Sequence, residues 1–430
     1  MLRDNSIPAA AHDSYETESY KSSCLEGTRT QHIDDITAWT TRIDQSSQHR
    51  LLWMWGPAGV GKSAIAKSCA EKTAQEGSLC ASFFFSRTQH VDDPKLFFTT
   101  IAHQLVQKVD EYRQVLGSRI QHNQDLHTKG LDVQFRELII EPFLKLARQN
   151  MGVQDKTVII DGLDECNGDP AQSKIMELVA KSVIEHIDKI PLLWTIFSRP
   201  ESHINHEFSP YSISHLFAKV ELSVSESDDG DIRLYFRDKF RPLASADTLW
   251  PLEDTLDILV LMVAGLWIYA TILVRFIMDP NLFPEQQLGL VLKFHSQQEK
   301  WIKSNTKSSV TGELDAFYRM IISRISPEHL RIVQQALLIH HISSKKPDDI
   351  LLMAVWSPDR PEIQLYVLAN ILSHTVSSLK HALSQLQSIL TFISKKEMYW
   401  GEPFPGSVHI SFYHASFMEL LLDKIRSGEY

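Results

Sequence analysis

One octapeptide constrains the fold of this chain more than any other feature, because it matches the phosphate-binding pattern G-x-x-x-x-G-K-[ST] at every defined position. The apolar run 51–55 before it is typical of a buried strand, and residues 64–71 after it are good helix formers. A helix start presents unpaired N–H groups to an anion, so this strand–loop–helix context suits phosphate. The octapeptide consists of Gly56, Pro57, Ala58, Gly59, Val60, Gly61, Lys62 and Ser63. We predict that it binds nucleotide, with Lys62 on the β- and γ-phosphates and the Ser63 hydroxyl on Mg²⁺.

Length, charge and cysteine content narrow the class of protein. A chain of 430 residues that is 43% hydrophobic can form two or three domains with substantial cores. The net charge of -10 disfavours general nucleic-acid or anionic-membrane binding. Four scattered cysteines without a C-x-x-C pair argue against a zinc site or a disulfide scaffold and favour a reducing compartment. No signal peptide is visible, so we expect a cytoplasmic protein.

Three further apolar runs predict strands, at 79–85, 157–161 and 191–197. Helical patterns separate them, one opened by the capping pair Asp93-Pro94 and another running from about 133 to 146. Strands that alternate with helices predict an α/β fold, here a P-loop NTPase parallel sheet with helices on both faces. Ligands of such sheets bind at the carboxyl ends of the strands, so the polar strand ends should converge near Lys62.

Acidic and basic side chains stand at two of these strand ends. Asp161 ends the third predicted strand and is a natural ligand for the Mg²⁺ shell. Either Asp164 or Glu165, just beyond it, could polarise an attacking water, although a solvated acidic loop is the simpler alternative. Arg199 follows the fourth strand and could sense the γ-phosphate and stabilise the transition state, or could be an ordinary surface arginine.

For two other residues, the sequence pattern alone favours a structural role over a functional one. Arg87, after the strand at 79–85, is better explained as a helper or a structural ion pair. His414 lies between apolar residues, a setting in which a lone histidine is usually a satisfied structural residue.

The remaining chain predicts a flexible lead-in and a mainly helical second half. Residues 1–23 are polar and unpatterned. The uncharged run 258–274 is at the short limit for a membrane span, and Gly265 near its middle favours a bend between two buried helices instead. Polar linkers are predicted at 223–231 and 304–312. Leucines from 379 to 390 indicate a helix, and a strand and helix follow at 408–413 and 415–425, a pattern that fits a winged-helix domain.

Together, the phosphate loop, the DGLDE and FSRPE strand ends and the motifs CLEGTRTQHIDDITAW, LCASFFFSR, GLWIYAT and FYHASF resemble the NACHT domain of STAND-class P-loop NTPases, particularly the fungal NLR-like kind. The resemblance implies a flexible lead-in at 1–23, a nucleotide-binding domain at 24–222, a helical domain at 223–303, and a linker with a winged-helix domain at 304–430. It also implies an ATP/ADP switch with Mg²⁺ as cofactor, in which Gly27 to Arg29 lie near the adenine and His414 contacts the β-phosphate of ADP.

The chain departs from this family in two places. Trp267 stands in Gly265-Leu266-Trp267 where many relatives carry a proline that packs near the adenine, and its indole could stack on the base instead. Relatives usually carry an N-terminal effector domain and a C-terminal repeat sensor, and we expect this chain to lack both.

Three functional hypotheses follow. The first is a signalling switch that hydrolyses ATP slowly and oligomerises with itself or with NLR-like proteins in a nucleotide-controlled way. The second is a truncated, non-catalytic adaptor that binds nucleotide and pairs with full-length relatives. A winged-helix DNA-binding regulator is disfavoured, because Lys380 is the only fixed positive charge of the candidate recognition helix at 375–390. The chain also lacks an N/T-K-x-D tetrapeptide, which favours adenine over guanine.

Overall fold

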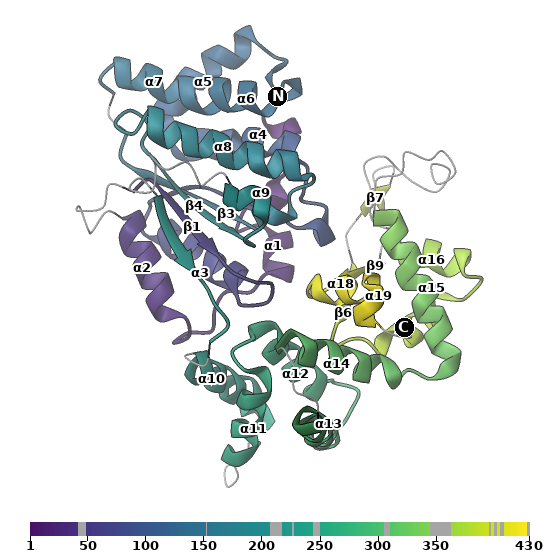
Figure 1. The fold of residues 1–430 in the computed structure, drawn as a ribbon. Coiled ribbons are helices and arrows are strands. Elements are labelled where there is room, and N and C mark those ends of the chain that lie inside the picture. The colour runs from purple at the N-terminus through teal and green to yellow at the C-terminus, as the bar shows by residue number, and fades with distance from the viewer. Residues whose placement is uncertain are drawn as a thin grey trace. The chain divides into compact units, whose positions relative to one another are not determined.

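The four predicted strands and a fifth, β5, which was not predicted, form one parallel sheet in the order β2–β3–β4–β1–β5 (Figure 1). In the computed structural model the chain divides into two units, Met1–Val224 and Ser225–Tyr430, and the sheet belongs to the first. The strands are β1 Leu51–Trp55, β2 Leu79–Phe84, β3 Lys156–Asp161, β4 Leu192–Ser198 and β5 Phe217–Glu221. The structure describes residues 1–41, 49–151, 153–206, 217–225, 228–243, 250–304, 310–344, 363–394, 397–399, 402–404 and 408–427.

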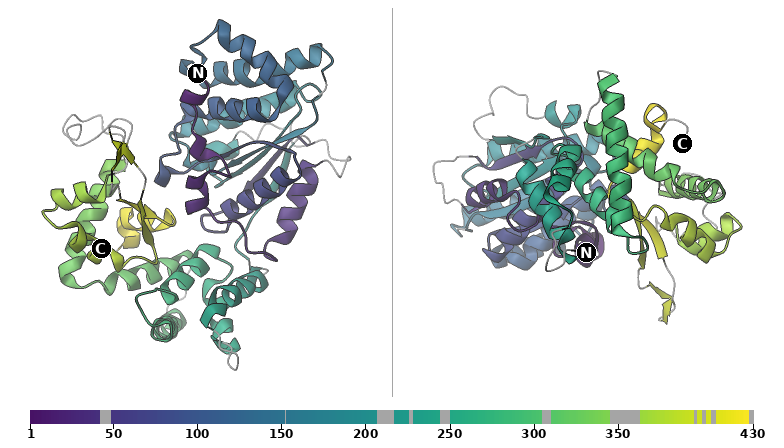
Figure 2. Two further views of the ribbon diagram at one scale, coloured as in Figure 1. Left: turned by 180° about the vertical axis from the view of Figure 1, so that it is seen from behind. Right: turned by 90° about the horizontal axis from the view of Figure 1, so that it is seen from below.

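Helices cover both faces of this sheet, which confirms the predicted P-loop NTPase architecture of the first unit. α2 and α3 lie on one face and α4, α5, α7 and α8 on the other, as Figure 2 also shows from behind. The helices are α1 Tyr15–Tyr20, α2 Thr30–Thr40, α3 Lys62–Gln75, α4 Phe97–Lys108, α5 Asp110–His122, α6 Leu131–Gln134, α7 Glu141–Arg148, α8 Asp169–Glu185 and α9 Ser202–His206. A π-helical turn at Phe135–Ile140 joins α6 to α7.

Aromatic side chains fill the space between the sheet and α4. Phe97 of α4 lies 5.0 Å from Phe83 and 5.5 Å from Phe85, measured between ring centroids. Phe98 contacts Phe135, which in turn contacts Trp194 of β4. Because these rings are fully or almost fully buried, their burial contributes much of the hydrophobic free energy that holds α4 to the sheet.

The expected flexible lead-in at 1–23 is not what the structure shows. Leu2 and Ala10 join the core of the first unit, and Ser14 caps the start of α1, with its hydroxyl accepting the N–H of Thr17. The Ile7 N–H donates to Thr100 Oγ1 of α4, at 2.9 Å. The polar composition gave no sign of this packing, because only a few apolar residues of the segment make the contacts.

In its described residues the second unit consists mainly of helices, with two short antiparallel strand pairs between residues 390 and 412. β6 pairs with β9, and β7 with β8. The helices are α10 Asp229–Phe240, α11 Glu253–Val263, α12 Trp267–Ile277, α13 Pro284–Ser304, α14 Val310–Ser323, α15 Pro327–Ser344, α16 Leu365–Ile371, α17 Val376–Ser384, α18 Ser416–Leu422 and α19 Lys424–Ser427. The strands are β6 Leu390–Ser394, β7 Glu397–Tyr399, β8 Glu402–Phe404 and β9 Val408–Phe412.

One predicted helix and one predicted linker of this unit have different bounds in the structure. The helix predicted to continue to Leu390 ends at Ser384, and Leu390 instead begins β6, where the run Leu390–Ser394 contains the β-branched and aromatic residues that favour a strand. The second predicted linker is shorter than expected, since α14 already begins at Val310. Residues 226–227 of the first linker and 305–309 of the second lie outside the described residues.

The apolar run 258–274 is a helix pair, as predicted, rather than one long helix. α11 ends at Val263 and α12 begins at Trp267. Ala264 and Gly265 between them both have positive φ, 43° and 80°. Among the described residues, no helix has the length and apolar character that crossing a membrane requires.

Gly265 gives a direct test of this bend. A Cβ at this position would lie 2.5 Å from the Ser225 carbonyl oxygen, and its φ of +80° is unfavourable for any other residue. We expect Gly265→Ala to lower the free energy of unfolding by about 1–3 kcal/mol, measured by chemical denaturation. Gly289→Ala is the control: its Cβ would meet nothing within 4 Å, and alanine suits the interior of α13. Equal stability of the Gly265→Ala protein and the wild type would contradict the argument.

Candidate functional site

The carboxyl ends of β1, β3 and β4 lie level with one another. Trp55 at the end of β1 pairs with Ser198 of β4, and Asp161 at the end of β3 pairs with Phe197. The Trp53 indole N–H donates to Ser198 Oγ at 2.8 Å, which fixes the end of β4 against β1. The predicted convergence of the polar strand ends at one edge of the sheet is therefore confirmed.

Glycines shape the phosphate loop that follows β1. A Cβ on Gly56 would lie 2.2 Å from the Leu222 carbonyl oxygen, so only glycine fits there. Gly59 and Gly61 have φ of 80° and 98°, and Gly61 is the residue that caps α3. Phosphate oxygens commonly bind to backbone N–H groups at the start of a helix, and glycines leave these groups accessible because they have no Cβ. The loop thus fits a nucleotide phosphate chain.

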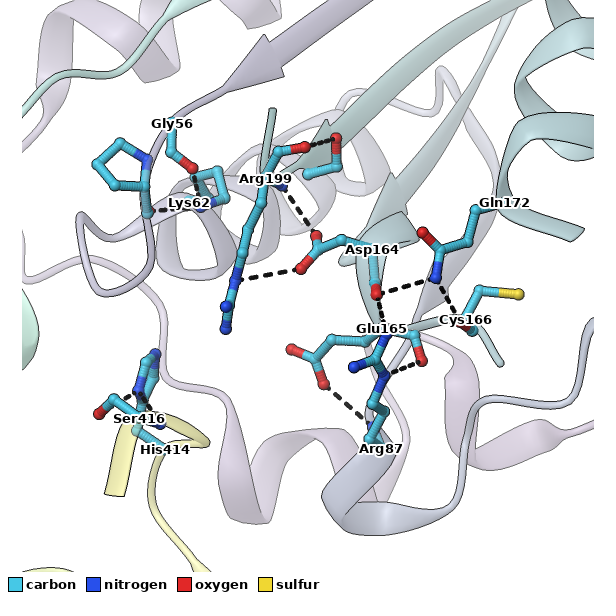
Figure 3. A network of polar contacts seen from close by, with 12 residues as sticks. Gly56, Lys62, Arg87, Asp164, Glu165, Cys166, Gln172, Arg199, His414 and Ser416 are labelled. Atoms are coloured by element: carbon cyan, nitrogen blue, oxygen red, sulfur yellow. Dashed lines mark hydrogen bonds and ion pairs between the residues drawn. The ribbon is translucent and has the colours of Figure 1, made fainter. Parts of the chain in front are cut away.

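Lys62 begins α3 and folds back over this loop (Figure 3). Its ammonium group donates to the carbonyl oxygens of Gly56, at 2.7 Å, and Pro57, at 2.8 Å. Burial lowers the pKa of Lys62 to about 8, and the nearby Asp164 carboxylate offsets this only in part. Lys62 is half-buried, and among the described residues its hydrogen bonds go to neutral carbonyl oxygens, so its ammonium can take an anionic partner. Ser63 is the next residue of α3, where the motif requires it.

Asp161 is almost fully buried, with 1% of its surface exposed, and forms an ion pair. Its Oδ2 accepts from the Lys21 ammonium, which also donates to the Phe85 carbonyl oxygen at 3.1 Å. Burial alone would lower the pKa of Lys21, but the carboxylates of Asp161 and Glu165 outweigh it and raise that pKa. Asp161 Oδ1 is buried without a hydrogen-bond partner in the described part of the chain. One orphaned carboxylate oxygen fits the role of a cation ligand.

Asp164 and Arg199 are brought together across the strand ends (Figure 3). The Arg199 backbone N–H donates to Asp164 Oδ1 at 2.9 Å, and its guanidinium Nε lies 3.3 Å from Oδ2. Both oxygens of the Asp164 carboxylate are therefore committed to Arg199. This arrangement makes Asp164 a holder of Arg199 and leaves Glu165 as the better candidate to orient water.

Glu165 differs from Asp164 in its partners. Its Oε2 accepts the backbone N–H of Arg87 at 3.0 Å, while the Arg87 guanidinium donates to the carbonyl oxygens of Asp164 and Glu165. Burial raises the pKa of Glu165, and the Lys21 ammonium opposes that shift. Arg87 thus supports the acidic loop, in line with the predicted helper role. Among the described residues its guanidinium contacts backbone carbonyl oxygens, and its backbone N–H contacts the Glu165 carboxylate.

Gln172 supports the same loop and has no counterpart in the sequence predictions. Its side-chain amide donates to the carbonyl oxygens of Asp164 and Cys166, at 3.1 and 2.7 Å, and it is 1% exposed. Its Oε1 lies 2.7 Å from His203 Nε2. A glutamine inside a helical pattern carries no signal of such a role, and Lys21 was equally hidden in the polar lead-in.

Arg29 lies behind the phosphate loop. It is 6% exposed, has a φ of 55° and caps α2. Its Nη2 donates to the Val60 carbonyl oxygen at 2.9 Å. Arg29 therefore braces the loop in this structure, and its expected position near the adenine stays a prediction.

His414 and Trp267 belong to the second unit, so their roles toward nucleotide stay predictions. His414 Nδ1 accepts the Ser416 backbone N–H at 3.1 Å, which puts the proton of the neutral imidazole on Nε2. Ser416 Oγ lies 2.8 Å from Tyr318 OH of α14. Trp267 begins α12 and meets the Tyr235 ring edge-on, with centroids 5.9 Å apart.

A metal ion at this sheet edge would have one protein carboxylate as ligand. Within the described residues no group of three or more His, Cys, Asp or Glu side chains could hold a metal. Mg²⁺ commonly takes one or two protein oxygens and completes its shell with water and substrate phosphates. Asp161 and Ser63 fit that mode, with the phosphate loop beside them.

One comparison with known families covers the residues of this site. The family model described as nephrocystin 3, N-terminal, matches residues 27–199. That range begins at Gly27, includes the phosphate loop and the acidic loop, and ends at Arg199. It is less than half of the chain, so it marks a similarity, and the NACHT resemblance stays a prediction. A comparison with curated proteins found no match.

Solved structures with a similar backbone were also found. The ORC2 protein of Aeropyrum pernix, solved as ADPNP and ADP complexes, has a TM-score of 0.41 at 12% identity and covers 96% of this chain and 97% of its own. Cdc6p of Pyrobaculum aerophilum has a TM-score of 0.38 at 11% identity, with the same coverage. PCH-2 of C. elegans has a TM-score of 0.37 at 10% identity and covers 64% and 71%. At TM-scores this low, the likeness carries no argument about ligands or partners.

The lowered pKa of Lys62 predicts a pH dependence for ADP binding. A bound polyphosphate would raise that pKa above its free value of about 8. Between about pH 7, above which the terminal phosphate of ADP is ionised, and the pKa of Lys62, binding should depend little on pH. Above that pKa binding should weaken by up to about tenfold per pH unit, with uptake of a proton. Calorimetry in two buffers of different ionisation enthalpy measures the proton uptake. A flat affinity across this alkaline range in the wild type would contradict the prediction.

Proposed function

We propose that this protein is an ATP/ADP-binding switch of the STAND type, with a NACHT-like nucleotide-binding domain and slow Mg²⁺-dependent ATP hydrolysis. One observation carries the proposal: a glycine-shaped phosphate loop, an almost buried carboxylate and an Asp164–Arg199 pair meet at one edge of a parallel sheet. Nucleotide-controlled assembly with copies of itself or with NLR-like proteins, and the winged-helix role of residues 304–430, are part of the same proposal.

Each residue has a distinct task in this scheme. The loop N–H groups and Lys62 bind the phosphates, replacing the contacts of Lys62 with Gly56 and Pro57. Ser63 and Asp161 would hold Mg²⁺, which when bound neutralises charge on the β- and γ-phosphates. Glu165 orients the attacking water, since its raised pKa suits an acceptor of protons better than that of an ordinary carboxylate.

Arg199 is proposed to report which nucleotide is bound. In the structure its guanidinium rests on Asp164, 3.3 Å from Oδ2. A γ-phosphate is a bidentate acceptor that competes with this carboxylate for the same guanidinium. Movement of Arg199 from Asp164 to phosphate would pull on the end of β4 and on the segment that follows it. Such a differential contact is what a ligand needs to shift a two-state equilibrium.

The second candidate is a non-catalytic adaptor that binds nucleotide for stability and pairs with NLR-like relatives. The Lys21–Asp161 ion pair favours it, because a cation from the chain itself already neutralises the proposed magnesium ligand. The two candidates share the nucleotide site and differ in turnover.

The nucleotide content of the purified protein tests both candidates. We expect denatured wild-type protein to release about one equivalent of ADP, identified by chromatography, and Lys62→Ala protein to release none, because the phosphates lose their main charged partner. Lys72→Ala, which removes an exposed lysine from the same helix, should retain the nucleotide. A wild type that is empty and does not bind added ATP or ADP would refute the proposal.

The rate of ATP hydrolysis distinguishes the two candidate functions and tests the role of Glu165. We expect Glu165→Gln to reduce ATP hydrolysis about a hundredfold or more and to leave ADP affinity unchanged, because it removes a proton acceptor and not a phosphate contact. Phosphate release and calorimetry supply the two measurements. Glu185→Gln, at the exposed end of α8, is the control. Hydrolysis that persists in Glu165→Gln refutes this role, and wild-type protein that binds ATP without hydrolysing it favours the adaptor.

A further inference from the structure

Lys21 lies where a divalent cation would meet Asp161. Its ammonium contacts Asp161 Oδ2 and the Phe85 carbonyl oxygen, two oxygens at the ends of neighbouring strands. The side chains of Lys21 and Asp161 are 9% and 1% exposed. Two oxygen acceptors in a shielded position are the surroundings that a hard cation prefers, and here a lysine occupies them.

The chain holds Lys21 in this place from both sides. Upstream, the His12 backbone N–H donates to Ser82 Oγ of β2 at 2.9 Å, and the Lys21 N–H closes α1 on the Thr17 carbonyl oxygen. Downstream, the Ser23 hydroxyl donates to Glu71 at 2.6 Å and the Cys24 N–H to Ser68 Oγ at 2.9 Å, both on α3. The segment 12–24 is therefore a strap fixed to β2 at one end and to α3 at the other.

The charges at this sheet edge balance with one cation at Asp161. Lys21 already faces the carboxylates of Asp161 and Glu165, while Lys62 and Arg199 stand near the acidic loop. A divalent ion bound to Asp161 would lie next to the Lys21 ammonium, and like charges at that distance repel strongly in a shielded site. Asp161 Oδ1 has no hydrogen-bond partner among the described residues, but an ion bound there would share one carboxylate with the Lys21 ammonium on Oδ2. Binding of Mg²⁺ at Asp161 is therefore weakened for as long as the Lys21 side chain stays in place.

We infer that Lys21 is a built-in counter-cation of Asp161 that competes with Mg²⁺, so that the protein binds ADP almost independently of Mg²⁺ while the strap is in place. This inference rests on the proposed nucleotide site and specifies which cation serves it. Release of the strap, by whatever binds it, would convert the site to Mg²⁺-dependent nucleotide binding.

The coupling between Mg²⁺ and ADP tests the inference on the full-length protein. ADP affinity is measured by calorimetry in excess EDTA and in excess MgCl₂ for the wild type, Lys21→Met and Lys72→Met. Methionine keeps the length and apolar stem of lysine without its charge. Lys72→Met is the matched control, because it breaks another lysine–aspartate pair of the same unit, with Asp34 at 2.7 Å on the surface.

We expect the ratio of the two affinities to be near one in the wild type and in Lys72→Met, and to rise to about tenfold or more in Lys21→Met. The wild-type ratio is a test by itself should Lys21→Met not fold: a wild type whose ADP binding depends strongly on Mg²⁺ overturns the inference. So does a folded Lys21→Met protein with a wild-type ratio, or one that loses ADP binding in both conditions, which would make Lys21 a phosphate ligand.

A titration with Mg²⁺ alone separates this inference from the proposed function. Should no variant bind ADP, the proposed nucleotide switch fails, yet competition at Asp161 can still be measured. Tighter binding of Mg²⁺ to Lys21→Met than to the wild type then supports the competition. Equal Mg²⁺ binding by the two proteins overturns it.

Discussion

Compensation of buried charge governs the candidate site. The parallel sheet brings Asp161, Asp164 and Glu165 to one edge, where burial would make uncompensated carboxylates costly. Each carboxylate has a different partner that compensates its charge. Lys21 pairs with Asp161, Arg199 pairs with Asp164, and the backbone N–H of Arg87 donates to Glu165. The positions of the cations follow from this requirement, and so does the shape of the loop between β3 and α8.

Under the proposed function, the same compensation would make the site responsive to nucleotide. A phosphate chain brings negative charge to the loop, where Lys62 now rests on neutral carbonyl oxygens and Arg199 on a carboxylate. A ligand that offers these cations better partners changes the contacts at the ends of β1 and β4. The supporting contacts of Arg87 and Gln172 involve backbone carbonyl oxygens, so they can persist while the charged partners exchange.

The second unit has its own internal connections. The Arg426 guanidinium forms two 2.8 Å contacts with Asp315 of α14, and Tyr318 of the same helix lies 2.8 Å from Ser416 Oγ. These contacts hold α19 to α14 and fix the segment that carries His414. The Arg275 guanidinium of α12 lies 3.4 Å from the Tyr413 ring centroid and ties α12 to the same segment.

The sequence by itself determined the phosphate loop, the strands β1 to β4 and the edge at which Lys62, Asp161 and Arg199 meet. Those features depend on local patterns and on the rule that parallel strands end at a common edge, so one chain is enough to predict them. It also indicated the bend at Gly265, because glycine marks a backbone that other residues avoid.

Only the tertiary structure decided which partner each charged group takes. Lys21 reaches Asp161 across 140 positions of sequence, and Arg87 reaches the acidic loop across 77. Such pairs depend on how the strap and the end of β2 pack. Composition and periodicity describe local segments, so they do not indicate which two distant residues form a pair. The flexible lead-in that the composition predicts is wrong for this reason: the segment is attached by a few hydrogen bonds and apolar residues whose partners lie on α3, α4 and β2.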